Sequence, residues 1–270
     1  MHFSAPRLPR GRPALVVAHP GHELRLHGWL EVARPRVLVL TDGSGARGQS
    51  RLPSTSRLLA AAGATPGAVF GRLTDRALYA AILARDAALA LGLVDELTTM
   101  IVGHAIDYVV ADALEGYNPA HDLCHVLVSA AVELAARAGR RVVHLDFSLV
   151  GRPDARPSRP GSVKLRLDDA ALARKLAAAS AYVGLGDEVA TALAAQGVEA
   201  FRVECLRPLA PDALHALPPE DPPFYERYGA GRVAAGRYGQ VLRYREHFEP
   251  LAEAVRRRVL VEEPCAASAS

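Results

Sequence analysis

Short, continuous runs of apolar residues alternate with helical patterns along most of this chain. Residues 14–18 (ALVVA), 36–40 (RVLVL), 108–111 (YVVA) and 141–145 (RVVHL) each have the composition of a strand that is buried on both faces. Strands that alternate with helices pair in parallel through right-handed crossovers. The sequence therefore predicts an α/β protein, in which helices cover both faces of a mostly parallel sheet.

These patterns form one uninterrupted series. We expect a single domain over residues 13–260, with a flexible arm at 1–12 and a frayed tail at 261–270. A further strand is predicted at 199–206 and loops at 151–162 and 208–223, which are rich in proline. Helices are predicted at 23–32, 54–63, 75–101, 121–139, 168–185, 187–196 and 238–259.

The charge pattern argues against several classes of partner. The 32 basic and 29 acidic residues are interspersed and give a net charge of +3, so we expect no nucleic-acid partner. No apolar run approaches the roughly 18 residues that a membrane helix needs, and the first residues lack the apolar segment of a secretory leader. Three cysteines are too few for a disulfide framework. We expect a cytoplasmic protein that acts on a small-molecule substrate, with self-association left open.

Three histidines follow predicted strands. His19 and His22 come directly after the first strand, and His121 opens a helix beyond the loop that follows residues 108–111. Ligands of parallel sheets bind beyond the carboxyl ends of the strands. Three neutral imidazoles with a fourth position open make a catalytic type of zinc site. We therefore predict Zn²⁺, or another divalent transition metal, on these histidines; the alternative is that His19 and His22 are ordinary polar residues at a strand end and a helix start.

The motifs around these histidines resemble those of the PIG-L (LmbE-like) family of zinc-dependent N-deacetylases. HPGHE at 19–23 stands where the family has HPDDE, TDG at 41–43 matches the next strand end, and NPAHD at 118–122 stands where the family has HPDHD. Further likeness lies at 175–182 and 223–247, so that the resemblance spans about 13–255 in matching order. It implies a Rossmann-like fold with the metal site at the carboxyl ends of the strands.

The resemblance implies an intact metal set and an altered catalytic set. His19 and His121 match metal ligands of the family, and His22 replaces a metal-binding aspartate. Gly21 occupies the place of the aspartate that serves the family as general base, and Asn118 that of the histidine which stabilises the oxyanion. Ala120 replaces the aspartate of HPDHD.

Elementary chemistry predicts some compensation. A metal held by three neutral imidazoles keeps its full charge, which lowers the pKa of bound water to near 7. Asn118 can still donate a hydrogen bond to an oxyanion. For the proton donor to the leaving amine we favour Glu23 as catalytic residue. Further candidates are Asp42, Asp112, Glu115 and His125.

Three positions are expected to meet the substrate: Gly21, Asp42 and Tyr117. Glycine at position 21 should leave an empty volume; the alternative is that the backbone needs glycine for a strand-end turn at φ > 0. Because aspartate occupies the matching family position, we favour the first and expect Gly21→Asp to fold and to gain hydrolysis. Asp42 has the alternative function of holding its turn. Cys124 is interpreted as a small buried residue of the helix rather than as a nucleophile.

Three functions remain open on this basis. The first is a metal-dependent hydrolase that removes an N-acyl group, in particular N-acetyl, from a small amine such as an amino sugar or a biosynthetic intermediate. The second is a family member with other, non-hydrolytic metal chemistry. The third is a metal-binding pseudoenzyme or binding subunit without turnover.

Overall fold

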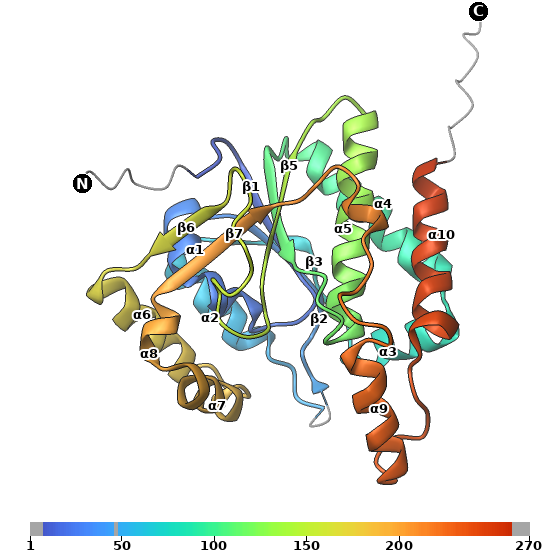
Figure 1. Ribbon diagram of the computed structural model, residues 1–270. Helices are drawn as coiled ribbons and strands as arrows, with labels where there is room; N and C mark the ends of the chain where they lie inside the picture. The colour runs from blue at the N-terminus through green and yellow to red at the C-terminus, as the bar shows by residue number, and fades with distance from the viewer. Residues whose placement is uncertain (1–7, 46–47, 261–270) are drawn as a thin grey trace, which may run out of the picture.

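The computed structural model describes residues 8–45 and 48–260. All its strands lie in one seven-stranded sheet of order β3-β2-β1-β4-β5-β7-β6 (Figure 1). The five strands from β3 to β5 are parallel, whereas β7 runs antiparallel to both of its neighbours. The strands are β1 Pro13–Val17, β2 Arg36–Thr41, β3 Thr65–Leu73, β4 Tyr108–Asp112, β5 Val143–Phe147, β6 Val163–Arg166 and β7 Val203–Pro208. The predicted α/β class with a mostly parallel sheet is confirmed.

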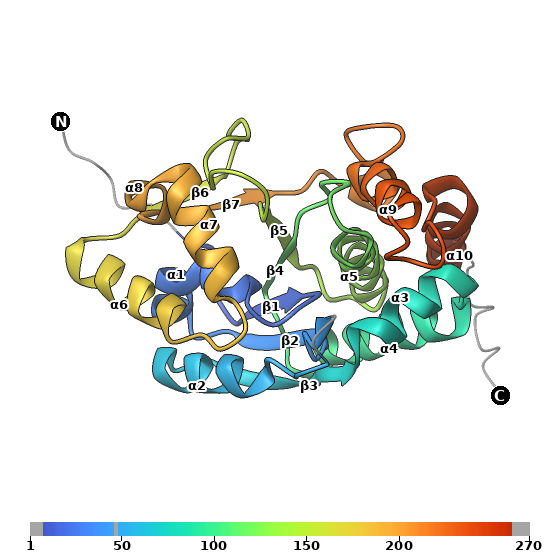
Figure 2. The same cartoon turned by 90° about the horizontal axis from the view of Figure 1, so that it is seen from below.

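Helices cover both faces of this sheet (Figures 1 and 2). The α-helices are α1 His27–Ala33, α2 Leu52–Ala62, α3 Asp75–Ala84, α4 Ala87–Gly103, α5 Pro119–Arg137, α6 Asp169–Ser180, α7 Gly186–Gln196, α8 Val198–Phe201, α9 Phe224–Ala234 and α10 Glu249–Leu260. The shorter elements are the 3-10 helices η1 His22–Leu26 and η3 Ala213–His215, and the π-helix η4 Tyr244–Phe248.

Strand β1 lies in the middle of the sheet and shows why its sequence is apolar throughout. Ala14 and Val16 face a core built with α3, α4, α5 and α10. Leu15 and Val17 face the opposite core, built with α1, α2 and α6. Successive side chains of a strand point to opposite faces, so a strand covered on both sides needs apolar residues at every position.

Several predicted elements differ from the observed ones. The long helix expected at 75–101 is interrupted at Arg85, which has φ 55°, and Asp86 caps α4 by accepting a hydrogen bond from the amide of Leu89. The strand expected at 199–206 begins instead with the short helix α8 and continues as β7. The helix expected at 238–259 is a loop as far as Arg243, then η4 and α10.

Four elements were not predicted: β3, β6, η3 and α9. Strand β3 contains Pro66, Gly67 and Gly71, and its register with β2 is irregular, so it carries the local signals of a loop. It forms a strand because it lies along the edge of the sheet, where only one neighbour must be paired. The start of α9 follows a run of prolines, and the helix contains two glycines.

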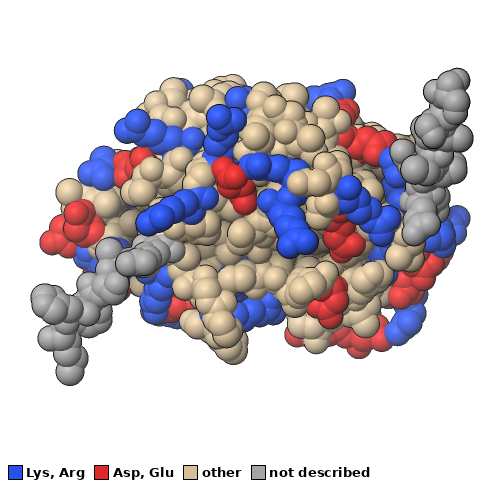
Figure 3. All heavy atoms as spheres, turned by 90° about the horizontal axis from the view of Figure 1, so that it is seen from above, with Lys and Arg blue, Asp and Glu red and all other residues tan. Residues whose placement is uncertain are grey.

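The predicted tail at 261–270 lies outside the described residues, as does most of the predicted arm. The last part of that arm is anchored, because the amide of Arg12 donates to the carboxylate of Asp107 at 2.6 Å. Within the described ranges no helix is long and apolar enough to cross a membrane. Basic and acidic side chains are mixed on the face shown in Figure 3.

A buried ion pair joins the helical layer to the antiparallel edge of the sheet. Lys175 of α6 donates from Nζ to Glu204 of β7 and to the carbonyl of Arg25, both at 2.8 Å. The same carboxylate accepts hydrogen bonds from the amides of Gly28 and Trp29 in the first turn of α1. Burial lowers the pKa of Lys175, and Glu204 opposes that shift. The pair therefore holds α1, α6 and β7 together.

Removing one partner of this pair should be costly. We expect Lys175→Met to lower the free energy of unfolding by about 3–5 kcal/mol, because Glu204 is left buried without its cation. The matched control is Lys164→Met, which removes an exposed ion pair with Asp154 and should cost less than about 1 kcal/mol. Urea unfolding of both variants measures the difference; equal midpoints would contradict the role assigned to Lys175.

Candidate functional site

His19 follows β1 and is held by two oxygen atoms on one side of its ring. Its Nδ1 lies 2.8 Å from Oγ1 of Thr41 and 3.0 Å from Oδ1 of Asp75. The Thr41 hydroxyl also donates to the carbonyl of Ala18 at 3.0 Å. A carboxylate beside Nδ1 favours the tautomer that carries its proton there, which leaves the lone pair on Nε2. The ring is therefore oriented with Nε2 available.

The carboxylate of Asp75 is itself stabilised in its charged form. Burial opposes ionisation, but hydrogen bonds from His19, Thr41 and the amide of Gly45, together with the charge of His19, hold the pKa of Asp75 well below its usual range. Asp75 is the first residue of α3, whose preceding residue Thr74 accepts a hydrogen bond from the amide of Ala77. The helix start thus fixes the position of the carboxylate.

His22 is held in the same way by the end of another strand. Its Nδ1 lies 3.0 Å from both carboxylate oxygens of Asp112, the last residue of β4. Asp112 also accepts the amide hydrogen of Ala18 at 2.8 Å. Burial raises the pKa of Asp112 to about 7, against the effect of the Ala18 hydrogen bond. A hydrogen bond between Nδ1 of His22 and the carboxylate of Asp112 orients this ring and leaves the lone pair of Nε2 free to bind a ligand.

His121 completes the group from the first turn of α5. The helix begins here because Asn118 accepts a hydrogen bond from the amide of Ala120 and Pro119 occupies the first helical position. The His121 ring is 8% exposed, and its buried Nδ1 has no hydrogen-bond partner within the described residues. This nitrogen could therefore take a ligand without giving up a hydrogen bond, although a buried ring nitrogen of His27, His125 and His144 is also without a partner in this part of the chain.

The structure brings the three predicted histidines together. Their ring centres are 5.4 Å (His19–His22), 5.2 Å (His19–His121) and 4.4 Å (His22–His121) apart. Imidazoles that bind one tetrahedral zinc ion at Zn–N distances of about 2.0–2.1 Å have ring centres about 5 Å apart. As the side chains lie, however, no group of three or more His, Cys, Asp or Glu in residues 8–45 and 48–260 is arranged to hold a metal ion. Metal binding here therefore stays a prediction.

The surroundings keep two of these rings neutral. Burial, followed by the charge of His19 and of the guanidinium groups of Arg51 and Arg25, lowers the pKa of His22 well below its ordinary value. Burial and the two neighbouring histidines do the same for the pKa of His121. Neutral imidazole is the form that binds a metal, so the donor chemistry fits a divalent transition metal.

Asn118 lies beside this group with its amide nitrogen unused. Its Oδ1 accepts hydrogen bonds from the amide of Ala120 at 2.8 Å and from the hydroxyl of Tyr79 at 2.9 Å. Because both contacts engage the oxygen, Nδ2 is left to donate, and it makes no hydrogen bond within the described residues. The side chain can therefore act as a hydrogen-bond donor at the site.

Glu23 is fully buried and is occupied by structural hydrogen bonds. Its Oε2 accepts the amide hydrogen of Gly21 at 2.7 Å, and its Oε1 accepts the hydroxyls of Thr55 at 2.8 Å and Tyr182 at 3.1 Å. Burial raises the pKa of Glu23, against these hydrogen bonds. The contacts give Glu23 the function of holding the turn at Gly21, and its predicted role as proton donor receives no geometric support.

Gly21 does not leave the empty volume that was expected. Its backbone has φ +110°, which residues with a Cβ rarely adopt, and a Cβ added there would lie 2.3 Å from Cδ1 of Leu185. The expectation that aspartate fits at this position is therefore wrong. At this position the structure has a turn that needs glycine, and the Leu185 side chain lies against it.

Three of the remaining predicted residues are engaged in structural hydrogen bonds, whereas Tyr117 is exposed and Cys124 is buried. Asp42 holds its own turn, since Oδ1 accepts the amide hydrogen of Ser44 at 2.9 Å, as the alternative interpretation stated. Glu115 binds the backbone at 149–150 and His125 the carbonyl of Ala213. Tyr117 is 47% exposed and remains a candidate for substrate contact. Cys124 is fully buried in the core.

Sequence reasoning missed Thr41, Asp75, Tyr79 and Arg51 as neighbours of the histidines. Asp75 and Tyr79 are on α3, which follows the unpredicted strand β3. Because that strand was not predicted, there was no reason to place the start of α3 at the carboxyl ends of the parallel strands, where His19 lies. The pair Thr74–Asp75 was the available signal, because threonine followed by an acidic residue is typical of a helix start.

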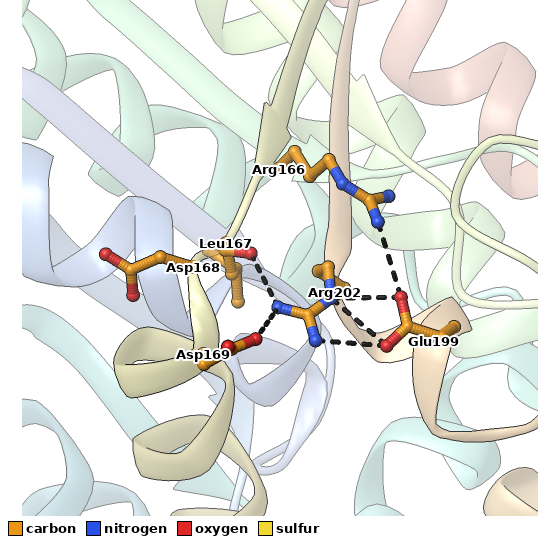
Figure 4. Close-up of a pocket in the computed structure, with 6 residues that line it drawn as sticks. All are labelled: Arg166, Leu167, Asp168, Asp169, Glu199 and Arg202. Carbon is orange, nitrogen blue, oxygen red and sulfur yellow. Dashed lines mark hydrogen bonds and ion pairs between the residues drawn. The ribbon is translucent and has the colours of Figure 1, made fainter.

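A surface hollow of about 580 Å³ lies away from the histidines. It lies at the corner of β6, α6 and α8 (Figure 4). There Arg202 is paired with Asp169 and Glu199, and Arg166 with Glu199. Asp168 caps α6 by accepting the amide hydrogen of Ala171. Because these groups bind one another, the hollow presents a charge-paired surface rather than a second reactive centre.

Solved structures similar to this chain include the following two. The conserved protein TT1542 from Thermus thermophilus aligns with a TM-score of 0.49 and 21% identity, over 74% of this chain and 94% of that one. The A40926 pseudoaglycone deacetylase Dbv21 aligns with a TM-score of 0.43 and 17% identity, over 74% and 97%. No family model and no curated protein matches the sequence. These likenesses leave activity, metal and substrate open.

The backbone at Gly21 generates a stability prediction. Gly21→Ala should lower the free energy of unfolding by about 1–3 kcal/mol, because alanine is strained at this φ and its Cβ meets Leu185. In the matched control, Gly92→Ala on the exposed side of α4, a Cβ meets nothing within 4 Å, and helix propensity should raise stability by about 0.5–1 kcal/mol. Thermal unfolding of both variants tests this; a neutral Gly21→Ala would refute the strained turn.

Proposed function

We propose that the chain is a zinc-dependent hydrolase that removes an N-acyl group, in particular N-acetyl, from a small amine such as an amino sugar or a biosynthetic intermediate. The observation that carries the proposal is the convergence of His19, His22 and His121 with ring centres 4.4–5.4 Å apart. Two of these rings are held from behind by carboxylates, as metal-binding histidines commonly are. The family resemblance of the motifs names the reaction.

The three imidazoles would hold the metal, and the unpartnered Nδ1 of His121 supports their assignment. When bound, such a metal polarises an acyl carbonyl and makes water more acidic. Asp75 and Asp112 keep His19 and His22 in the ligand orientation. The described side chains as they lie do not form a metal-binding group, so binding would require the rings to move.

The chain's own groups favour negative charge on the acyl oxygen. Asn118 would supply Nδ2 as a donor, since its Oδ1 is occupied by the hydroxyl of Tyr79 and the amide of Ala120. A single donor of this kind is typically worth about 3–4 kcal/mol of transition-state stabilisation. The guanidinium groups of Arg51 and Arg25 add positive potential close to His22.

One observation favours a second function, metal binding without hydrolysis. No carboxylate projects from position 21, where Leu185 fills the space. The carboxylates around the histidines are engaged: Asp75 and Asp112 bind histidine rings, and Glu23 binds the Gly21 turn. A general base would have to come from a change in one of these contacts. The second candidate is therefore a metal-binding protein with non-hydrolytic chemistry or with no turnover.

Metal content and acetate release test the first function against the second. We expect about one zinc ion per chain in the purified wild type, and release of acetate from a panel of N-acetylated amino sugars and small amines. His121→Ala should lose most of the metal and at least a hundredfold in rate, because the site keeps only two imidazoles. The matched control is His104→Ala, an exposed histidine at the end of α4, which should change neither.

The outcomes separate the candidates. Metal that is lost in His121→Ala but retained without acetate release in the wild type would overturn the hydrolase and support the second function. Equal metal content in His121→Ala and His104→Ala would contradict both, because the three histidines would then not be the ligands.

A further inference from the structure

An exposed row of aromatic rings begins beside the candidate site. Tyr117 and Phe224 stack with ring centres 4.9 Å apart and an interplanar angle of 2°. Phe224 and Tyr228 continue the stack at 5.8 Å and 24°. The exposed fractions are 47%, 39% and 49%. We call Tyr117, Phe224 and Tyr228 the aromatic strip.

The strip is continuous with the site. Tyr117 directly precedes Asn118, which caps the helix that carries His121. The amide of Tyr225 donates to the carbonyl of Gly116 at 3.2 Å and ties the start of α9 to this loop. Figure 2 shows α9 beside the end-on view of α5, at the same end of the sheet. A molecule that reaches the histidines can therefore also lie along the strip.

An arginine with no acidic partner lies at the far end of the strip. The guanidinium carbon of Arg232 lies 5.8 Å from the ring centre of Tyr228 and 5.4 Å from that of Tyr238. Its Nε is buried without a hydrogen-bond partner, and no ion pair of Arg232 occurs among residues 8–45 and 48–260. Other arginines of this region are paired with carboxylates: Arg227 with Glu220, Arg243 with Glu226 and Arg245 with Asp221.

This arrangement fits an oxyanion. Two rings hold the Arg232 side chain in place, so that little conformational entropy is lost when it binds a ligand. Guanidinium binds carboxylate, phosphate and sulfate groups through paired hydrogen bonds. Stacked rings separated by 4.9 and 5.8 Å lead from the site toward that cation. The recognised chemistry is therefore a ring-bearing, apolar segment that ends in an anionic group.

We infer that the substrate extends beyond the acylated amine as a ring-bearing segment that lies on the aromatic strip and ends in an oxyanion bound by Arg232. This inference rests on the proposed function for the location of the acyl group. It adds the substrate class: an N-acyl amine that carries a ring-containing extension with an acidic group at its end.

Binding of a matched pair of probes tests the inference. The probes are methanesulfonyl-Phe-Phe with a free carboxylate and its carboxamide; the sulfonyl group replaces acetyl so that no hydrolysis accompanies binding. On the zinc-loaded protein, calorimetry should give the acid a Kd about five- to tenfold lower than that of the amide, as expected for a charge-assisted contact. Arg232→Gln should abolish this preference. Phe224→Leu should weaken both probes about fivefold, since both lose a stacked ring.

The matched control is Arg237→Gln, an exposed arginine of the following loop that lies outside the ring pair; it should keep the preference for the acid. If Arg232→Gln does not fold, Arg232→Lys keeps the charge without the planar group and should show an intermediate preference. Equal Kd values of acid and amide in the wild type would overturn the role of Arg232. The same result is expected if the rings bind a neutral sugar instead of an acidic ligand. Loss of the preference in Arg237→Gln to the same extent would also overturn the role of Arg232.

Failure of this inference differs from failure of the proposed function. If no N-acetyl compound is hydrolysed but the Arg232-dependent preference for the acid probe is found, the binding site is supported and the hydrolase function is contradicted. If small neutral amides are hydrolysed and the preference is absent, the hydrolase stands and this inference falls.

Discussion

The buried carboxylate of Asp112 connects the central strands to the candidate site. It ends β4, accepts the amide hydrogen that follows β1, and contacts the ring of His22. A carboxylate loses much free energy when it is removed from water, so it is tolerated only where hydrogen bonds replace hydration. Those hydrogen bonds exist only when β1 and β4 are paired in their observed register. The orientation of His22 therefore depends on the pairing of β1 with β4.

The same principle governs the layer behind the histidines. Glu23, Thr55 and Tyr182 form a buried polar group that holds the Gly21 turn. Lys175 and Glu204 hold α1 against the edge of the sheet. Each group would be costly if any member lost its partner. The turn that carries His19 and His22 is thus fixed from behind by polar contacts rather than by apolar packing alone.

The conformation at Gly21 affects the catalytic residues that the site can offer more than it affects the orientation of the histidines. The hydrogen bonds that orient the His19 and His22 rings come from Thr41, Asp75 and Asp112, whereas a carboxylate at position 21 would need a different backbone and a displaced Leu185. The expected empty volume at Gly21 is absent, because the backbone there has a φ of +110° and the Leu185 side chain lies against it. The predicted role of this position in catalysis stays a prediction.

The sequence by itself determined the α/β class and the strands β1, β2, β4 and β5, because a strand buried on both faces must be apolar at every position. It also determined that three histidines follow strand ends, since parallel strands bring their carboxyl ends to one edge. It could not determine β3, whose glycines and proline are tolerated only at the edge, nor the break at Arg85 and the loop before η4, where tertiary packing overrides local propensity. Only the tertiary structure decided which oxygen atoms orient the imidazoles of His19 and His22, and placed Tyr79 against Asn118. It likewise decided that Glu23 is occupied and that Tyr117 continues into the rings of α9. Those contacts join residues far apart in the chain, and no local pattern encodes them.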